Sequence, residues 1–269
     1  MAAEFVPAGI DATLLLVRHG ESEWITRGLF QGQGDSPLTA LGRRQAELVA
    51  ERIAHASRPS ALPVPARPPA TIVHSPLSRA AATAEAIATA LARRDPSGAA
   101  RPVTRRVDPG LVEIGQGEWE GLPGTEIAER WPDLIRGWRS DPLSGWAPGG
   151  ESLAEVDARV RAAFGRLLAE LAAIPPSGAG RPSPVLGYAD EPGDEPWAVI
   201  VAHDGVFKVA ALALLDLPLA RFWMLPFALC GISVIELRGG RARLRVHNMT
   251  DHLAEIEADT VSGAASGAA

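Results

Sequence analysis

Two residues near the start of the chain could bind an anion and react with it. Arg18 and His19 directly follow an apolar run, residues 14–17, that is typical of a buried strand. A guanidinium group grips phosphate or carboxylate through two parallel hydrogen bonds, and a neutral imidazole nitrogen can act as a nucleophile. In an open α/β sheet, ligands bind just beyond the carboxyl ends of the strands. The pair is therefore expected at the mouth of a crevice, where Gly20 would let the backbone turn and a ligand approach closely.

The elements that must position such residues follow from the hydrophobic pattern. Strand-like runs occur at residues 13–17, 70–73, 103–107, 197–202, 232–237 and 242–247. Helix-like stretches alternate with them at residues 38–55, 77–94, 151–174 and 206–215. Thr39 is expected to cap the first of these helices, and Ser152 with Glu155 has the spacing of a capping box. Alternation of this kind predicts an α/β fold, a three-layer α/β/α sandwich with a mostly parallel central sheet.

Short motifs recur along these elements. After RHG at residues 18–20 they read GLFQG at 28–32, DSPLT at 35–39, SPLSRA at 75–80, EIGQGEWEG at 113–121, GGES at 149–152 and VAHDGV at 201–206. In this order they resemble the histidine phosphatase superfamily, also called the phosphoglycerate mutase-like family. The resemblance covers roughly residues 12–253, and it implies a phosphoglycerate mutase-like α/β/α fold.

The resemblance also implies roles for five residues. A phosphomonoester is a dianion, and transfer of its phosphoryl group needs charge neutralisation, a nucleophile and an acid for the leaving oxygen. His19 would attack phosphorus and form a phosphohistidine, while Glu113 would protonate the leaving oxygen and then activate water. Arg18 and Arg79 would clamp the non-bridging oxygens. His203 would donate to the same oxygens, most usefully while protonated.

The remaining contacts with substrate are expected from Ser22, Gln31 and Gly32. The chain departs from the family at Ile25, where members usually have an asparagine whose amide helps to bind the transferred phosphoryl group. The resemblance implies no metal and no other cofactor.

Three alternatives stay open at this point. Glu118 and Glu120 lie close enough in sequence to compete with Glu113 for the role of acid. The motifs at residues 28–32 and 113–121 favour the phosphatase branch, so the predicted function is hydrolysis of a small phosphorylated metabolite, with a cofactor-dependent phosphoglycerate mutase as the alternative. A second alternative, suggested by Ile25, is a catalytically impaired relative that binds a phosphorylated ligand.

Composition excludes several other classes. The chain has 269 residues with a formal net charge of −6, and 46% of them are hydrophobic, as in ordinary soluble globular proteins. A net acidic chain argues against a general nucleic-acid binder. Arg241, Arg243 and Arg245 alternate along a predicted strand, and we interpret them as a solvated face. The sequence predicts a small phosphorylated substrate as partner, no nucleic acid and no membrane, and it does not indicate an oligomeric state.

Compartment and domain limits complete the expectations. The single cysteine, Cys230, excludes an intrachain disulfide and fits a reducing compartment. With neither a secretory signal nor an apolar run long enough to span a bilayer, the sequence predicts a cytoplasmic protein. Residues 1–253 are expected to form a single histidine phosphatase domain, with a Pro/Gly-rich loop at about 175–196 and a disordered tail at 254–269.

A lid-like insertion is expected at about residues 121–150. It carries Trp131, Trp138 and Trp146 on short helical pieces. Aromatic side chains on such an insertion could cover a site, so the choice of substrate is expected to depend on this segment.

Overall fold

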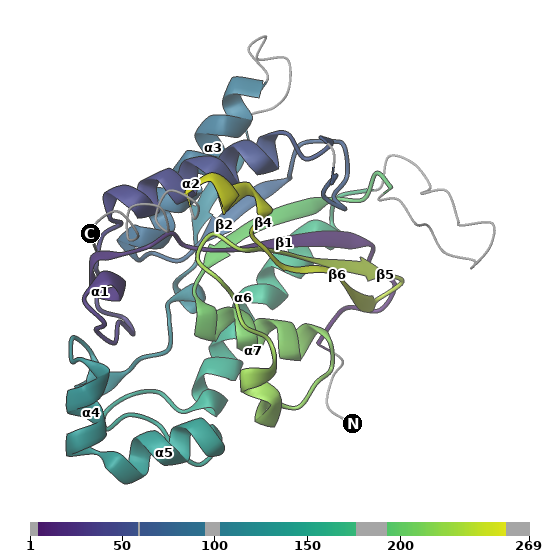
Figure 1. Cartoon of the computed structure of the whole chain (residues 1–269). Coiled ribbons are helices and arrows are strands. Elements are labelled where there is room, and N and C mark those ends of the chain that lie inside the picture. Colours follow the sequence, from purple (N-terminus) through teal and green to yellow (C-terminus); the bar gives the residue numbers. More distant parts are fainter. Residues whose placement is uncertain (1–4, 59, 95–102, 176–192, 257–269) are drawn as a thin grey trace.

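The computed structural model describes residues 5–58, 60–94, 103–175 and 193–256, and its centre is a six-stranded sheet (Figure 1). The strands are β1 (Ala12–Arg18), β2 (Thr71–His74), β3 (Thr104–Val107), β4 (Trp197–Ala202), β5 (Ile232–Arg238) and β6 (Arg241–Met249). Their order across the sheet is β3-β2-β4-β1-β5-β6. The first four in this order are parallel, and β5 is antiparallel to both β1 and β6. The predicted mostly parallel sheet is confirmed.

Helices cover both faces of the sheet, which completes the predicted sandwich (Figure 1). Two of them, α2 (Ala40–Ala54) and α3 (Ser78–Arg94), pack on one face, and two, α6 (Leu153–Ala172) and α7 (Asp204–Leu214), on the other. Successive side chains of β1 divide between the two cores, with Leu14 and Leu16 facing α6 and α7 and with Leu15 and Val17 facing α2 and α3. A strand buried on both faces explains why its sequence is a continuous apolar run.

Two predicted helix starts are present with their caps. The Thr39 hydroxyl accepts a hydrogen bond from the Gly42 amide at 2.9 Å. Ser152 and Glu155 form the complete capping box, each side chain bonded to the backbone of the other. These caps satisfy amides that the first turn of a helix leaves without partners.

The parallel strands bring distant residues to one edge of the sheet. His19, Ser75 and His203 directly follow β1, β2 and β4, which are neighbours in the order β2-β4-β1. The His19 amide donates to the carbonyl oxygen of Ala202 at 3.1 Å, and the Ser75 amide donates to that of Val201 at 3.0 Å. The hydrogen bonding of the sheet thus continues one residue past β1 and β2, and it aligns His19 and Ser75 with the end of β4, which His203 follows.

The predicted insertion folds as two short helices, α4 (Gly124–Arg130) and α5 (Pro132–Ser140), which project from the sandwich (Figure 1). They share a small core with Trp119, against which Trp131 and Trp138 pack, whereas Trp146 is exposed. The shorter elements are α1 (Glu23–Thr26) and the 3₁₀ turns η1 (Pro109–Leu111), η2 (Gly117–Trp119), η3 (Leu219–Met224) and η4 (Asp251–Leu253).

The alternating arginines of β6 do not form the solvated face that we expected. Arg241 is exposed, but Arg243 and Arg245 are partly buried against Glu236 of β5, with N–O distances of 4.0 and 3.1 Å. Glu236 is 1% exposed, and a buried carboxylate needs compensating partners. The prediction was wrong because the partner lies on the neighbouring strand, outside any local pattern.

Two predicted segments lie mostly in parts of the chain that the structure does not describe. The predicted loop at 175–196 and the predicted tail at 254–269 fall largely on residues 176–192 and 257–269, outside the described residues. In the part of the chain that is described, no helix is both long and apolar enough to cross a bilayer. Cys230 is a free cysteine and fully buried.

Candidate active site

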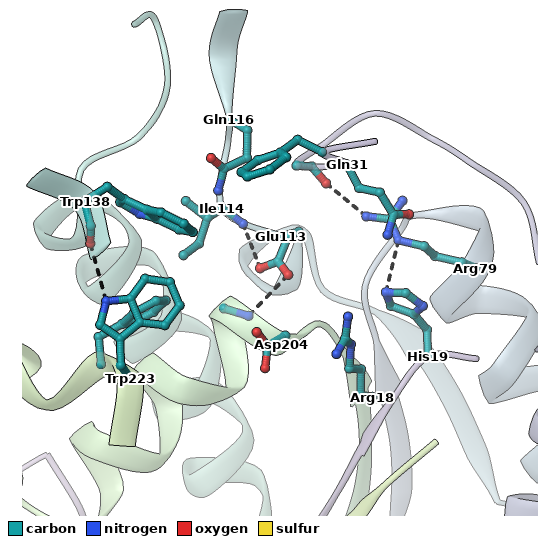
Figure 2. Close-up of a pocket in the computed structure, with 14 residues that line it drawn as sticks. Arg18, His19, Gln31, Arg79, Glu113, Ile114, Gln116, Trp138, Asp204 and Trp223 are labelled. Carbon is teal, nitrogen blue, oxygen red and sulfur yellow. Dashed lines mark hydrogen bonds between the residues drawn. The ribbon is translucent and has the colours of Figure 1, made fainter. Parts of the chain in front are cut away.

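A pocket of about 250 Å³ lies where β1 and β4 end (Figure 2). Its lining residues are Arg18, His19, Phe30, Gln31, Gly32, Arg79, Glu113, Ile114, Gln116, Trp138, Asp204, Gly205, Phe222 and Trp223. Most of the site residues expected from the sequence are therefore brought together in one place. Ser22 and His203 do not line the pocket.

The contacts of His19 determine which ring nitrogen carries the proton. Its Nδ1 lies 2.7 Å from the carbonyl oxygen of Gly20, and a carbonyl oxygen can only accept, so Nδ1 is the protonated nitrogen. Nε2 keeps its lone pair and accepts a hydrogen bond from Arg79 Nε at 3.2 Å. Burial, followed by the charges of Arg18 and Arg79, holds the pKa of His19 well below its usual value. A neutral ring whose lone pair is on Nε2 can act as a nucleophile.

Arg79 is fully buried and is held by the backbone of the loop opposite. Its Nη1 and Nη2 atoms donate to the carbonyl oxygens of Gly34 and Gly32 at 2.8 and 2.9 Å. With the bond from Nε to His19, three of the five guanidinium donors are occupied. One donor on Nη1 and one on Nη2 remain, which is enough for the two-bond grip of an anion expected from the sequence, and that grip stays a prediction.

Arg18 is less engaged. Its Nη1 atom donates to the carbonyl oxygen of Phe227 at 2.7 Å, and its Nε atom is buried without a hydrogen-bond partner among the described residues. Buried polar atoms are almost always satisfied. An anion in the pocket that Arg18 lines could satisfy this donor.

The Glu113 carboxylate caps the start of α7. Oε1 accepts from the amides of Ile114 at 2.9 Å and Val206 at 3.2 Å, and Oε2 accepts from that of Gly205 at 3.2 Å. A Cβ at Gly205 would lie 2.7 Å from Glu113 Oε1, so this close approach requires glycine. Burial and then the Asp204 carboxylate raise the pKa of Glu113, against the opposing effect of the amides. A raised pKa favours the protonated form, which can donate a proton.

The two alternative acids are placed elsewhere. Glu118 is exposed, and Glu120 Oε1 accepts from the amides of Gln33 and Gln116 at 2.9 and 3.0 Å. Neither glutamate lines the pocket. Of the three carboxyl groups in this segment, the described pocket holds that of Glu113.

His203 is fully buried beside His19, with 5.0 Å between the two ring centroids. Its Nε2 lies 2.8 Å from the hydroxyl oxygen of Ser75, and its Nδ1 is buried without a partner among the described residues. Burial, and then the neighbouring His19 and Arg79, lower the pKa of His203 well below its usual value. The lowered pKa favours a neutral ring, and donation from His203 to the oxygens of an anion stays a prediction.

Two of the three residues expected to contact substrate line the pocket. These are Gln31 and Gly32, whereas Ser22 is buried and its hydroxyl donates to Gln31 Oε1 at 2.7 Å. Ser22 thus orients a lining residue, and its direct contact with substrate stays a prediction. Ile25 lies in α1 and does not line the pocket.

Gly20 is needed for packing between two elements. A Cβ at this position would lie 2.4 Å from the carbonyl oxygen of Gly42 in α2. Its φ is not positive, so no left-handed turn requires glycine here. The missing side chain lets α2 pack against the end of β1, and the close approach of a ligand to Gly20 stays a prediction.

Sequence analysis missed Arg159 on α6, whose five donors all find acceptors. Nε and Nη2 bind the Glu151 carboxylate at 2.7 and 2.8 Å. Nη1 donates to the carbonyl oxygens of Gly110 and Val112 at 3.0 and 2.7 Å, and Nη2 donates to that of Glu113 at 3.0 Å. Arg159 thus ties the segment that carries the Glu113 carboxyl to a helix of the sandwich.

Aromatic side chains form another part of the pocket lining. Trp138 and Trp223 meet edge to face with centroids 4.6 Å apart, and Trp223 Nε1 donates to the Trp138 carbonyl oxygen at 3.3 Å. Of the three tryptophans singled out in the insertion, Trp138 lines the pocket. Phe222 and Trp223 were missed, because an apolar run gives no sign of which members face a cavity.

Asp204 adds a negative charge to the pocket. Its Oδ2 lies 2.5 Å from Nζ of Lys208, which is 6% exposed. The ammonium group also lies 4.9 Å from the ring centroid of Trp223, within the range of a cation–π interaction. Lys208 therefore both pairs with Asp204 and supports the aromatic lining.

This arrangement can bind an oxyanion, attack it with a ring nitrogen and protonate a departing oxygen. The unoccupied donors of Arg18 and Arg79 lie beside His19. Figure 2 shows Glu113 between these three residues and the two tryptophans, Trp138 and Trp223. Among the described residues, no group of three or more His, Cys, Asp or Glu side chains is arranged to hold a metal ion.

Comparison with known proteins agrees with this geometry. Residues 14–173 and 181–250 match the histidine phosphatase superfamily (branch 1). A glucosyl-3-phosphoglycerate phosphatase of Mycobacterium tuberculosis is 36% identical over 78% of each chain, and phosphoserine phosphatase 1 of Hydrogenobacter thermophilus is 29% identical over 90% of this chain and 95% of its own. The solved structure of a mycobacterial glucosyl-3-phosphoglycerate phosphatase with VO3 superposes with a TM-score of 0.67 at 32% identity, covering 88% of this chain and 99% of the other.

Proposed function

This chain belongs to the histidine phosphatase superfamily, and from that premise we propose that it hydrolyses a small phosphomonoester through a phosphohistidine intermediate. One observation carries the proposal. The Gly20 carbonyl oxygen keeps the proton of His19 on Nδ1, so that the unprotonated Nε2 faces the pocket beside two arginines.

The first step transfers the phosphoryl group to the enzyme. The Nε2 lone pair of His19 attacks phosphorus, a P–N bond forms and the P–O ester bond breaks. Glu113 gives its proton to the departing oxygen, so the alcohol leaves neutral. Arg18 and Arg79 stabilise the charge of the non-bridging oxygens through their unoccupied donors.

The second step regenerates the enzyme. The Glu113 carboxylate, which has just lost its proton, takes one from water as the water attacks phosphorus. The P–N bond breaks, inorganic phosphate leaves, and His19 returns to the neutral form. His203 supports both steps, since a dianion beside it would offset the charges that lower its pKa and would favour a protonated donor.

Support for a small substrate comes from the size of the pocket and from the relatives. A volume of about 250 Å³ is small for a ligand site. The relatives are named for glucosyl-3-phosphoglycerate and phosphoserine, both small phosphorylated metabolites. A cytoplasmic location is part of this proposal, because the buried free Cys230 suits a reducing compartment.

Release of the chromophore from an aryl phosphate in the presence of chelator tests the function. We expect steady turnover with stoichiometric release of phosphate. Absence of turnover on every phosphomonoester offered would refute the proposal and favour a ligand-binding relative. Conversion of 3- to 2-phosphoglycerate faster than release of phosphate would instead identify a mutase.

The pH dependence of kcat/KM is expected to be bell-shaped. Turnover requires neutral His19, so the acidic limb lies below the usual histidine pKa of 6.5, and it requires protonated Glu113, so the alkaline limb lies above the usual carboxyl pKa of 4.5. Because the Asp204 charge raises the pKa of Glu113, Asp204→Asn should move the alkaline limb to lower pH. Profiles of both proteins on one substrate measure this shift, and coincident alkaline limbs would assign that limb to another group.

Arg159→Lys is expected to lower kcat/KM for alkyl phosphates by about 10- to 100-fold, because a small displacement of a catalytic group is costly. An ammonium group has three donors without a planar fork, so at least two of the five bonds are lost. The loss should be smaller for aryl phosphates, which need little protonation by Glu113. Arg161→Lys is the matched control, since Arg161 pairs with Asp157 on the same helix. Equal losses on both substrates would leave Arg159 a purely structural role.

A further inference from the structure

The pocket has two chemically different ends. Figure 2 shows His19, Arg18 and Arg79 on one side, Trp138 and Trp223 on the other, and Glu113 with Asp204 between them. The lining on the tryptophan side also includes Phe222. An acid that protonates a leaving oxygen must lie within hydrogen-bond reach of that oxygen, which in an in-line displacement is on the side of phosphorus opposite the nucleophile. The leaving group of a phosphoryl group held at His19 therefore extends towards the tryptophans.

The aromatic end offers flat apolar faces held in fixed positions. Trp223 is locked to Trp138 by the edge-to-face contact and by the hydrogen bond from its indole N–H, and it meets Phe222 edge to face at 4.8 Å. Phe30 lines the pocket as well and lies 6.3 Å from Trp138, centroid to centroid. Trp223 is nevertheless 40% exposed, so part of this surface is free to contact a ligand. Rigid aromatic faces bind flat rings better than short flexible chains.

This end of the pocket offers a ligand no unpaired cation among the described lining residues. Among the described residues that line the pocket, the cationic ones are Arg18 and Arg79, both at the phosphoryl end. Asp204 faces the leaving group, and the nearby Lys208 ammonium is already paired with it. The other polar lining groups are the neutral amides of Gln31 and Gln116, which suit hydroxyl groups. A carboxylate on the leaving group would lie near Asp204, whose partner Lys208 is already engaged, and would find no unpaired cation among these lining residues.

We propose that the leaving group of the natural substrate is an uncharged, ring-bearing alcohol, a sugar or a nucleoside, whose ring lies against Trp138 and Trp223. This inference rests on the proposed phosphatase function and names its substrate class. The pocket volume of about 250 Å³ suits a small substrate that consists of a phosphoryl group and a ring beside it. Stacking supplies the affinity, and the missing partner for a ligand carboxylate disfavours acidic alternatives.

Four phosphate esters of primary alcohols test the two parts of the proposal. Glucose 6-phosphate and adenosine 5′-phosphate carry rings, glycerol 3-phosphate is acyclic and uncharged in its leaving group, and 3-phosphoglycerate differs from it by a carboxylate. We expect kcat/KM for at least one ring substrate to exceed that for glycerol 3-phosphate by about 10-fold or more, and glycerol 3-phosphate to exceed 3-phosphoglycerate. The better ring substrate distinguishes a sugar from a nucleoside.

Two outcomes would overturn the inference while leaving the phosphatase function intact. Equal kcat/KM for glycerol 3-phosphate and both ring substrates would refute the role of the ring. Turnover of 3-phosphoglycerate at or above that of glycerol 3-phosphate would refute the preference for an uncharged group. Failure to hydrolyse even an aryl phosphate would refute the proposed function itself, so the two failures are distinguishable.

Two substitutions test which residue is responsible for the preference for a ring and which for the preference for an uncharged leaving group. Trp223→Leu keeps apolar bulk but removes the aromatic face, and it should reduce the ring preference by about 10-fold. Trp146→Leu is the matched control, because Trp146 is 42% exposed in the insertion and lies outside the pocket. Asp204→Asn should reduce the preference for glycerol 3-phosphate over 3-phosphoglycerate, and this ratio cancels any effect on Glu113 that is common to both substrates. An unchanged ratio in either variant would overturn the corresponding assignment.

Discussion

Replacing His19 with glutamine is expected to lower kcat/KM for an aryl phosphate by at least about 10⁴-fold, because the reaction loses its nucleophile. Glutamine keeps polar atoms near the Gly20 carbonyl oxygen and Arg79, so the buried site retains hydrogen-bond partners. The residual rate would come from the arginines and Glu113 acting on bound water. No other change in the pocket should have a larger effect.

The intermediate itself gives a second measurement. Rapid quenching with a radiolabelled phosphomonoester should trap an acid-labile, base-stable phosphoenzyme in the original protein and none in His19→Gln. His55→Gln is the control, since His55 ends α2 away from the pocket and contacts Glu51. A stable label in His19→Gln would move the nucleophile to another residue.

Glu113→Gln is expected to separate substrates by the acidity of their leaving groups. For alkyl phosphates, loss of the general acid should cost about 10²- to 10⁴-fold in kcat/KM. Aryl phosphates expel a stable phenolate, so their loss should be at least about 10-fold smaller when transfer to His19 limits kcat/KM. The carbonyl oxygen of glutamine can take the place of Oε1 and accept from the amides of Ile114 and Val206, but its NH2 group cannot accept from Gly205 as Oε2 does, so the cap of α7 is kept only in part.

The exposed Glu118 provides the control for this experiment. Glu118→Gln should behave like the original protein with both classes of substrate, because Glu118 does not line the pocket. Equal losses for alkyl and aryl phosphates in Glu113→Gln would argue that this residue only holds α7 in place. Another group would then have to protonate the leaving oxygen.

Local patterns were sufficient to predict the framework and much of the pocket. The apolar runs of β1 and β4 are strands buried on both faces, and the Thr39 and Ser152 caps mark helix starts that the structure contains. Arg18, His19 and Glu113 belong to short motifs at the ends of such elements, so their neighbours in sequence also position them in space. Glu118, by contrast, is exposed while Glu113 lines the pocket, because the backbone turns between them. The spacing of the two residues in the sequence does not reveal this turn.

Contacts between residues far apart in the sequence could not be predicted, because local patterns do not show which distant segments meet. Arg159 meets the Glu113 segment across 46 residues of sequence, and Trp223 meets Trp138 across 85. Both lie in helical segments where an arginine or a tryptophan is unremarkable. The lowered pKa of His203 could not be predicted either, since it results from burial and from the neighbouring His19 and Arg79 and not from its own motif.

The buried Lys208 has a practical consequence for the chemistry that can be done on this protein. It is the one lysine in the sequence, and its amine is sequestered between Asp204 and the aromatic lining. Reagents that label, cross-link or immobilise proteins through surface lysines therefore find no lysine target here. The rate of reductive methylation at Lys208, followed by mass spectrometry of the peptide that contains it, would instead measure how often its contacts with Asp204, Phe222 and Trp223 open to solvent.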